Sequence, residues 1–150
     1  MSDHSITVNG REVTIPVAGS TPLVEVLRHE LGLVGTRQGC GLEQCGACRV
    51  LLDGKPVYAC TLTLAESAGH VIESIESHAP DLEKLKAQFL SANAGQCGFC
   101  LSGILMTALA HLRDNPRPDR ASVQLALRDH LCRCGAHNRI INAVLAAADG

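Results

Sequence analysis

The chain has 150 residues, of which 46% are hydrophobic and 19% are charged, and its formal net charge is −2. This composition is typical of a globular protein and excludes an intrinsically disordered chain. The nearly neutral balance argues against nucleic acid as the main partner, because nucleic-acid-binding domains are usually strongly basic. Only three aromatic residues are present, Tyr58, Phe89 and Phe99, so we expect a core of aliphatic side chains.

The segment 6–17 alternates apolar and polar residues around Asn9-Gly10, which predicts a β-hairpin. Thr21-Pro22 then predicts the start of a helix, with Thr21 as N-cap, an apolar face from Leu23 to Leu31, and Gly32 as its end. A glycine-rich loop follows over 35–48. Residues 49–59 predict a second hairpin that turns at Asp53-Gly54, and 70–75 predict a further short strand.

From Pro80 onwards the spacing of apolar residues changes to that of helices. Asp81 is placed to cap a helix that carries Leu82, Leu85 and Phe89. A second helix is expected around 104–112, and two more over 121–131 and 137–148, which together make a small four-helix bundle. We therefore expect an α+β chain with two domains, 1–77 and 78–150, each containing four of the eight cysteines.

The N-terminus lacks the basic and apolar regions of a signal peptide, and the longest apolar stretch, 101–112, is too short to span a bilayer. We therefore expect a cytoplasmic protein with no membrane span, unless a partner holds it at a membrane or carries it out in folded form. Disulfides are disfavoured in the cytoplasm, so the cysteines are expected to ligate metal.

The first four cysteines have the spacing Cys-x4-Cys-x2-Cys followed by a more distant cysteine, which is that of plant-type ferredoxins with one 2Fe–2S cluster. The glycines around them, such as Gly39, Gly41 and Gly46, let backbone N–H groups turn towards sulfur. Structural zinc fits this spacing poorly. The four residues are Cys40, Cys45, Cys48 and Cys60.

The second set is a Cys-x2-Cys pair at the start of the second helix and a Cys-x-Cys pair between the last two helices. Two such turns that face each other can close one four-sulfur site. Structural zinc stays open as an alternative here, with His137 as an extra candidate ligand, although a histidine at a helix start is more often a cap or a surface residue. The four residues are Cys97, Cys100, Cys132 and Cys134.

The spacing indicates no nucleophile–base pair and no phosphate-binding loop. The other histidines are expected to lie at the surface or at helix ends. Two iron–sulfur sites without substrate chemistry indicate a relay for single electrons between a donor and an acceptor. The alternative is a free-standing electron carrier or a metal-stapled binding module. An obligate subunit should expose an apolar patch that its partner covers, whereas a free carrier should not.

Three motifs, Gly39–Cys48, Gln96–Cys100 and Leu131–Gly135, resemble those of the iron–sulfur small subunit of the molybdenum hydroxylase (xanthine oxidase) family. The likeness extends over nearly the whole chain and is nearest to nicotinate- and isoquinoline-type dehydrogenase subunits. It implies a β-grasp ferredoxin domain, a four-helix domain and one 2Fe–2S cluster in each. It also implies that Gln96 and Cys134 contact the pterin of the molybdenum cofactor, and that Arg133 is structural.

The resemblance further implies a large molybdopterin subunit that hydroxylates an aldehyde or an N-heteroaromatic carbon, and an acceptor partner that carries FAD or haem, a flavin subunit or a cytochrome. The sequence departs from the family pattern at three places. Glu43 stands where Gly or Ala is common, Leu101-Ser102-Gly103 replaces Thr-Pro-Gly, and Ala136-His137-Asn138 replaces a frequent aromatic. These departures touch no cysteine.

Overall fold

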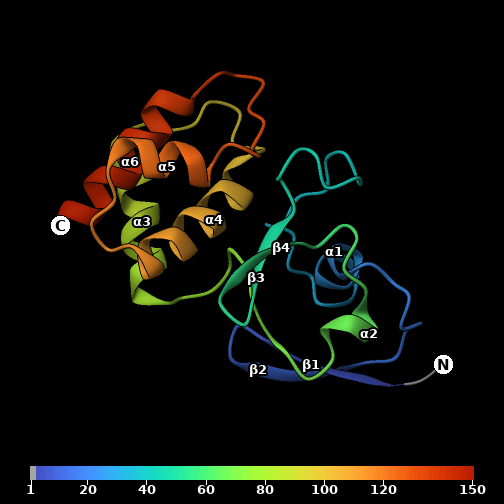
Figure 1. The fold of residues 1–150 in the computed structure, drawn as a ribbon. Coiled ribbons are helices and arrows are strands. Elements are labelled where there is room, and N and C mark those ends of the chain that lie inside the picture. Colours follow the sequence, from blue (N-terminus) through green and yellow to red (C-terminus); the bar gives the residue numbers. More distant parts are fainter. Residues whose placement is uncertain (1–2) are drawn as a thin grey trace.

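The computed structural model describes residues 3–150 and has two parts, a mixed sheet with short helices and a bundle of four helices (Figure 1). Five strands form the sheet in the order β2-β1-β5-β3-β4. The strands β1 and β5 are parallel, and the other neighbouring pairs are antiparallel. The strands are β1 (His4–Val8), β2 (Arg11–Ile15), β3 (Arg49–Leu52), β4 (Lys55–Tyr58) and β5 (Val71–Glu73).

Both predicted hairpins are confirmed, and their turns have the expected backbone. Asn9 and Gly10 have φ of 50° and 80°, and Asp53 and Gly54 have 49° and 82°, which matches the turn that follows the twist of two antiparallel strands. The strand predicted over 70–75 is shorter, because the side chain of Asn9 accepts a hydrogen bond from the Ser74 N–H and takes it out of the ladder.

The predicted helix after Pro22 is present, but in a different form. It starts as α1 (Leu23–Glu25) and continues as the π-helical turn η1 (Val26–Glu30), and Gly32 follows with φ of 67°. The prediction of Thr21 as N-cap was wrong: Pro22 holds that position, and no side chain caps the helix. The carbonyl of Thr21 instead accepts a hydrogen bond from the Leu64 N–H.

A short helix, α2 (Leu64–Ser67), was not predicted, although its signal is present in the sequence. Thr63 and Glu66 form a capping box, in which the Thr63 hydroxyl accepts from the Glu66 N–H and the Glu66 carboxylate accepts from the Thr63 N–H. The helix has only four residues, so no apolar periodicity reveals it.

The four-helix bundle is confirmed, with α3 (Pro80–Ser91), α4 (Leu101–Asp114), α5 (Arg120–Ala126) and α6 (His137–Asp149). Two details were wrong. Asp81 does not cap α3; Ala79 is the N-cap, Pro80 is the first residue, and the Asp81 carboxylate pairs with Arg113. The helix expected over 121–131 ends at Ala126, because the following segment turns towards the sheet, where the Leu131 N–H donates to the Cys45 carbonyl.

Strand β3 joins the two parts, because its side chains alternate between two cores. Val50 packs with the π-helical turn and the other strands, in a core that includes Ile6, Leu27 and Ile72. Leu51 points the other way and packs with the helices, and it is fully buried. The helix α4 therefore lies against the sheet at β3.

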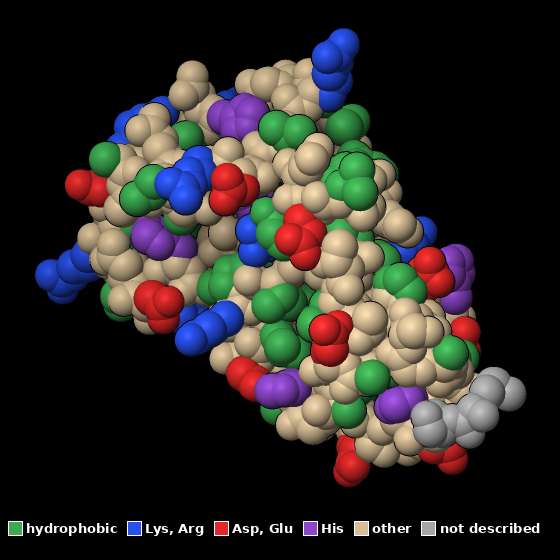
Figure 2. Space-filling model, turned by 45° about the vertical axis from the view of Figure 1, so that its right-hand side comes forward, with side chains coloured by type: hydrophobic (Ala, Val, Ile, Leu, Met, Phe, Trp, Pro, Cys, Tyr) green, Lys and Arg blue, Asp and Glu red, His purple; other side chains and the backbone are tan. Residues whose placement is uncertain are grey.

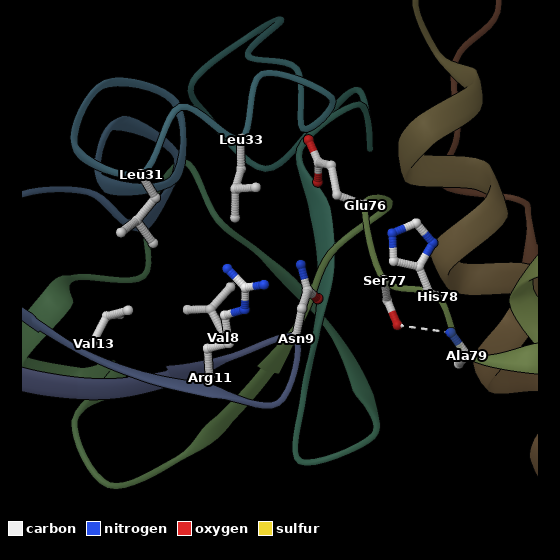
Figure 3. Close-up of a pocket in the computed structure, with 10 residues that line it drawn as sticks. All are labelled: Val8, Asn9, Arg11, Val13, Leu31, Leu33, Glu76, Ser77, His78 and Ala79. Carbon is white, nitrogen blue, oxygen red and sulfur yellow. Dashed lines mark hydrogen bonds between the residues drawn. The ribbon is translucent and has the colours of Figure 1, made fainter.

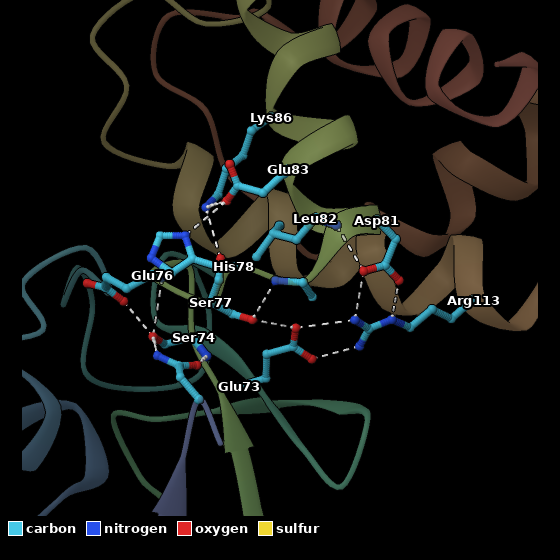
Figure 4. A network of polar contacts seen from close by, with 12 residues as sticks. Glu73, Ser74, Glu76, Ser77, His78, Asp81, Leu82, Glu83, Lys86 and Arg113 are labelled. Carbon is cyan, nitrogen blue, oxygen red and sulfur yellow. Dashed lines mark hydrogen bonds and ion pairs between the residues drawn. The ribbon is translucent and has the colours of Figure 1, made fainter. Parts of the chain in front are cut away.

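Arg113, near the C-terminal end of α4, binds the carboxylates of two segments at once (Figure 4). Its guanidinium donates to Asp81 on α3 at 2.7 and 3.1 Å, and to Glu73 on β5 at 2.7 and 3.2 Å. The Glu73 side chain is only 19% exposed, so this pair is less screened by water than a surface pair. The Arg113 contact also holds the pKa of Asp81 below its usual value.

No helix in the part of the chain that the structure describes is long and apolar enough to cross a membrane.

We expect Arg113→Met to lower the free energy of unfolding by about 1–2 kcal/mol, since charged hydrogen bonds to a half-buried carboxylate are lost. The thermal midpoint, measured by calorimetry on the full chain at pH 7, should then fall by a few degrees. The Asp81 share of this stabilisation is complete above its usual pKa of 3.8 and decreases as the pH falls through the lowered value. Arg117→Met is the control, because Arg117 is exposed; equal shifts for both variants would contradict the prediction.

Candidate metal centres

The first cysteine set lies in the loop that precedes β3 and at the end of β4. Cys40, Cys45 and Cys48 are in the loop, and Cys60 follows β4 by two residues. The thiols differ in burial: Cys40 is exposed, whereas Cys48 and Cys60 are buried. The antiparallel pairing of Arg49 with Tyr58 brings the two chain segments that carry them together.

Backbone N–H groups of the loop point at sulfur. The Cys40 Sγ accepts from the N–H groups of Leu42 at 3.3 Å and Gln44 at 3.2 Å, and the Cys45 Sγ accepts from the Cys40 N–H at 3.4 Å. The bonds from Leu42 and Gln44 favour the Cys40 thiolate and lower the pKa of Cys40 to about 7. The loop can turn this tightly because Gly41 and Glu43 have φ of 69° and 59°.

Contacts between the thiols link all four members of the first set. Cys40 contacts Cys45, Cys48 contacts Cys60, and Cys45 is close enough to affect the charge of Cys48. Burial raises the pKa of Cys48 to about 12, so this thiol loses its proton only when a positive charge compensates for it. Four converging sulfurs, with backbone donors around them, fit the thiolate ligation of a 2Fe–2S cluster.

Gly39 leaves room at this site. A Cβ at position 39 would come within 2.7 Å of the Cys45 Sγ, so any side chain there would displace a sulfur. Gly39 was expected to matter for its conformational freedom, but the structure shows that its small size is what the site requires.

The second set lies at one end of the helical bundle. Cys97 and Cys100 are in the turn before α4, with Cys100 as its N-cap, and Cys132 and Cys134 are in the turn between α5 and α6. Cys97 contacts Cys134, and Cys100 contacts Cys132. The charges of Cys97 and Cys100 also affect each other, so the structure brings all four together.

Local hydrogen bonds and burial act on these thiols in opposite directions. The Phe99 N–H lowers the pKa of the exposed Cys97, whereas burial raises that of Cys100 to about 12. Burial also opposes the charge on Cys132, but N–H groups at the start of α6, first that of Ala136, outweigh it and lower its pKa. Within residues 3–150, no three His, Cys, Asp or Glu side chains form the ligand group of a single metal ion.

Gln96 and Cys134 come together at the exposed edge of the second set. The Gln96 side-chain amide donates to the Cys134 carbonyl at 3.3 Å, and Gln96 itself is exposed. The other candidate ligand, His137, is the first residue of α6, and its Nε2 lies 3.2 Å from the His130 carbonyl.

His130 was expected at the surface or a helix end, and this was wrong. It is 3% exposed, and its Nε2 lies 2.9 Å from the Thr107 hydroxyl on α4. Its ring packs against Gly46 in the first cysteine loop. No signal in the sequence distinguishes it from the surface histidines, because its burial depends on contacts between distant segments.

The cysteines line no part of the cavity shown in Figure 3, which has a volume of about 620 Å³. It lies between the β1–β2 hairpin, the segment that carries Leu31 and Leu33, and the segment 76–79 before α3. Its lining is mostly apolar, with Glu76 and His78 at one side, so it is distinct from both candidate metal centres.

Comparison with known families agrees with this geometry. A family described as a 2Fe-2S iron-sulfur cluster binding domain matches residues 6–74, and a second family, described as a [2Fe-2S] binding domain, matches residues 71–145. Each match contains one of the two cysteine sets.

Two related small subunits match over almost their full length. The chain is 33% identical to the nicotinate dehydrogenase small FeS subunit of Eubacterium barkeri over 147 residues, which is 97% of this chain and 94% of the relative. It is 37% identical to the alpha subunit of isoquinoline 1-oxidoreductase of Brevundimonas diminuta, with 94% of both chains covered. Among solved structures, quinoline 2-oxidoreductase from Pseudomonas putida 86 matches with a TM-score of 0.92 and 36% identity, over 99% of this chain and 94% of that one. The chain therefore belongs to the family of iron–sulfur small subunits of molybdenum hydroxylases, in which a ferredoxin-like domain precedes a helical 2Fe–2S-binding domain.

Proposed function

We propose that this chain is an electron-transfer subunit whose two cysteine sets each hold one 2Fe–2S cluster. The observation that carries the proposal is the convergence of four thiols in each set, with backbone N–H groups directed at the outer ones. When bound, such clusters accept and release one electron at a time. We assign Cys40, Cys45, Cys48 and Cys60 to the first cluster, and Cys97, Cys100, Cys132 and Cys134 to the second.

In this proposal the chain holds the clusters and leaves substrate chemistry to the large molybdopterin subunit. The names of the relatives include nicotinate, isoquinoline and quinoline, so we propose an N-heteroaromatic substrate, with an aldehyde as the alternative, on the large subunit. We further propose that Gln96 and Cys134 contact the pterin, which their shared hydrogen bond and the exposure of Gln96 support.

Apolar side chains exposed around the cysteine loops support an obligate subunit over a free carrier. Leu42, Phe99 and Leu131 are 68%, 42% and 62% exposed, and each lies close to a cysteine in the chain. On the face shown in Figure 2, acidic and basic side chains are interspersed among apolar ones, with no field of a single sign. Exposed apolar side chains at a redox site indicate a surface that a protein partner covers.

Three further assignments belong to the proposal. The domain boundary falls between 77 and 78, in the segment that links β5 to α3. The acceptor is a flavin subunit or a cytochrome, and the complex is cytoplasmic.

The proposal of two 2Fe–2S clusters is tested by measuring iron, zinc and acid-labile sulfide in anaerobically purified protein, and by electron paramagnetic resonance after reduction. About four iron and four sulfide per chain, with two distinct signals, are expected; one zinc and two iron would overturn it.

Cys134→Ser and Cys60→Ser form a matched pair that tests the division of ligands. We expect each variant to retain about two iron per chain, because the other set of four thiols remains complete. Cys134→Ser should remove or shift only the spectrum of the second cluster, and Cys60→Ser only that of the first. If either substitution abolishes both signals, the assignment of ligands to two separate sets is wrong.

Gln96→Ala tests the contact with the molybdopterin subunit. We expect both clusters to remain, while the affinity for the large subunit falls by about 2- to 10-fold, the effect of losing one hydrogen bond. Titration of the separated subunits by calorimetry measures this affinity. Gln124→Ala is the control, since Gln124 is also an exposed glutamine but lies on α5, outside both cysteine turns. Loss of iron in Gln96→Ala would show that Gln96 supports the cluster site itself.

The pKa values predict an order of thiol reactivity in the cluster-free chain. At pH 7 about half of Cys40 is thiolate, because its pKa is lowered to about 7, whereas Cys48 and Cys100 stay protonated with pKa of about 12. Cys40 should therefore react with iodoacetamide at least about tenfold faster than either, as followed by mass spectrometry. In concentrated urea the rates should converge. Equal rates without urea would mean that the loop forms only around a cluster.

A further inference from the structure

Gly103 lies in the first turn of α4, where its φ is not left-handed and no turn requires glycine. Glycine is unfavourable inside a helix, so a buried glycine at such a position usually has a packing reason. Gly103 is only three residues after Cys100, the N-cap of the same helix.

The reason is a close approach to the first cysteine loop. A Cβ at position 103 would lie 2.0 Å from the carbonyl oxygen of Gly46, and 3.0 and 3.1 Å from the carbonyl carbons of Gly46 and Ala47. These atoms are backbone, so they cannot rotate away as a side chain could. Gly46 itself stands between Cys45 and Cys48, so the backbone of one candidate metal centre rests directly on the helix that starts at the other.

A second contact involves the α-carbon of Gly46. Gly46 has φ of 78°, and a Cβ there would lie 2.5 Å from Nδ1 of His130. Thr107, one turn beyond Gly103 on α4, holds His130 through its hydroxyl at 2.9 Å. The next residue, Leu131, donates its N–H to the Cys45 carbonyl at 3.0 Å, and Cys132 follows it directly.

We propose that Gly103 is a positioning residue: the contact of its bare backbone with Gly46, together with the contact between Gly46 and His130, which Thr107 holds, sets the separation between the two cluster sites. This inference rests on the proposed function, since it concerns the distance between two groups that the chain would hold. The far end of α4 is held separately, by the pairing of Arg113 with Glu73, so the separation at the near end depends on the glycine contact.

The size of the effect follows from the geometry. Real Cβ atoms essentially never approach other atoms closer than 3.0 Å, so Gly103→Ala requires α4 and the Gly46 loop to move apart by about 1 Å, from 2.0 Å. All eight cysteines remain, so both clusters should still assemble. The magnetic interaction between two reduced clusters weakens with the cube of their distance, and electron exchange weakens even more steeply.

The experiment compares wild type, Gly103→Ala and Arg113→Met as purified, full-length, cluster-loaded protein. For each, iron and sulfide content is measured first, and then the splitting of the paramagnetic resonance signals of the fully reduced protein at low temperature. We expect Gly103→Ala to keep its iron and lose part of the splitting. Arg113→Met should be less stable but keep the splitting, since it loosens only the distant end of α4.

A second pair of variants tests the same inference if Gly103→Ala does not fold or does not take up its clusters. Thr107→Val keeps the shape of the side chain but removes the hydroxyl that holds His130, and Thr107→Ser restores the hydroxyl. We expect Thr107→Val to broaden the split signals, because His130 no longer has a fixed position beside Gly46 and the separation of the two clusters then varies. Thr107→Ser should give the wild-type spectrum.

Two results would overturn the inference. One is a fully loaded Gly103→Ala with unchanged splitting, or, if that variant fails to load, no difference between Thr107→Val and wild type. The other is equal weakening in Gly103→Ala and Arg113→Met, which would show general loosening of the bundle instead of a local spacer. Neither result affects the proposed function, which fails instead if the wild type itself lacks two clusters.

Discussion

The packing of strand β3 on both of its faces is the constraint on which the arrangement of the molecule depends. Val50 and Leu51 are consecutive and completely buried, one in the core of the sheet and the other in the core of the helices. The strand begins directly after Cys48, and the helix that packs on it, α4, begins directly after Cys100. One short strand therefore joins the two parts that carry the cysteine sets, and the family's two domains meet at this strand.

The two candidate metal centres share a division between inner and outer thiols. The outer thiols, Cys40 and Cys97, receive backbone N–H groups, which lower their pKa values, whereas burial raises those of the inner thiols, Cys48 and Cys100, to about 12. The outer thiols are thus prepared to ligate iron at neutral pH. The inner ones give up their protons only to the metal, so cluster binding releases protons and is favoured as the pH rises.

The surface around the centres agrees with the role of a subunit. The apolar side chains Leu42 and Phe99 stand close to Cys40 and Cys100 in the chain and remain exposed, although apolar residues of this size are usually buried. The chain buries mostly aliphatic side chains in its two cores, whereas Cys40 and Cys97 remain exposed. This is the arrangement expected of a relay whose clusters must come close to groups held by other chains.

The sequence by itself determined most of the local elements and the chemical class of the sites. The turns at Asn9-Gly10 and Asp53-Gly54 and most of the strands and helices depend on interactions between residues close in the chain, and such patterns are visible in the sequence. The grouping of the cysteines was predicted from their spacing and from their division between the two predicted domains. Only the tertiary structure decided that Asp81 pairs with Arg113 instead of capping α3, and that His130 is buried. The same holds for Gly103, whose role depends on the close approach of the Gly46 backbone. Gly46 is 57 residues away in the chain, and the distance between two backbones that meet across a fold is set by packing, which no local pattern records.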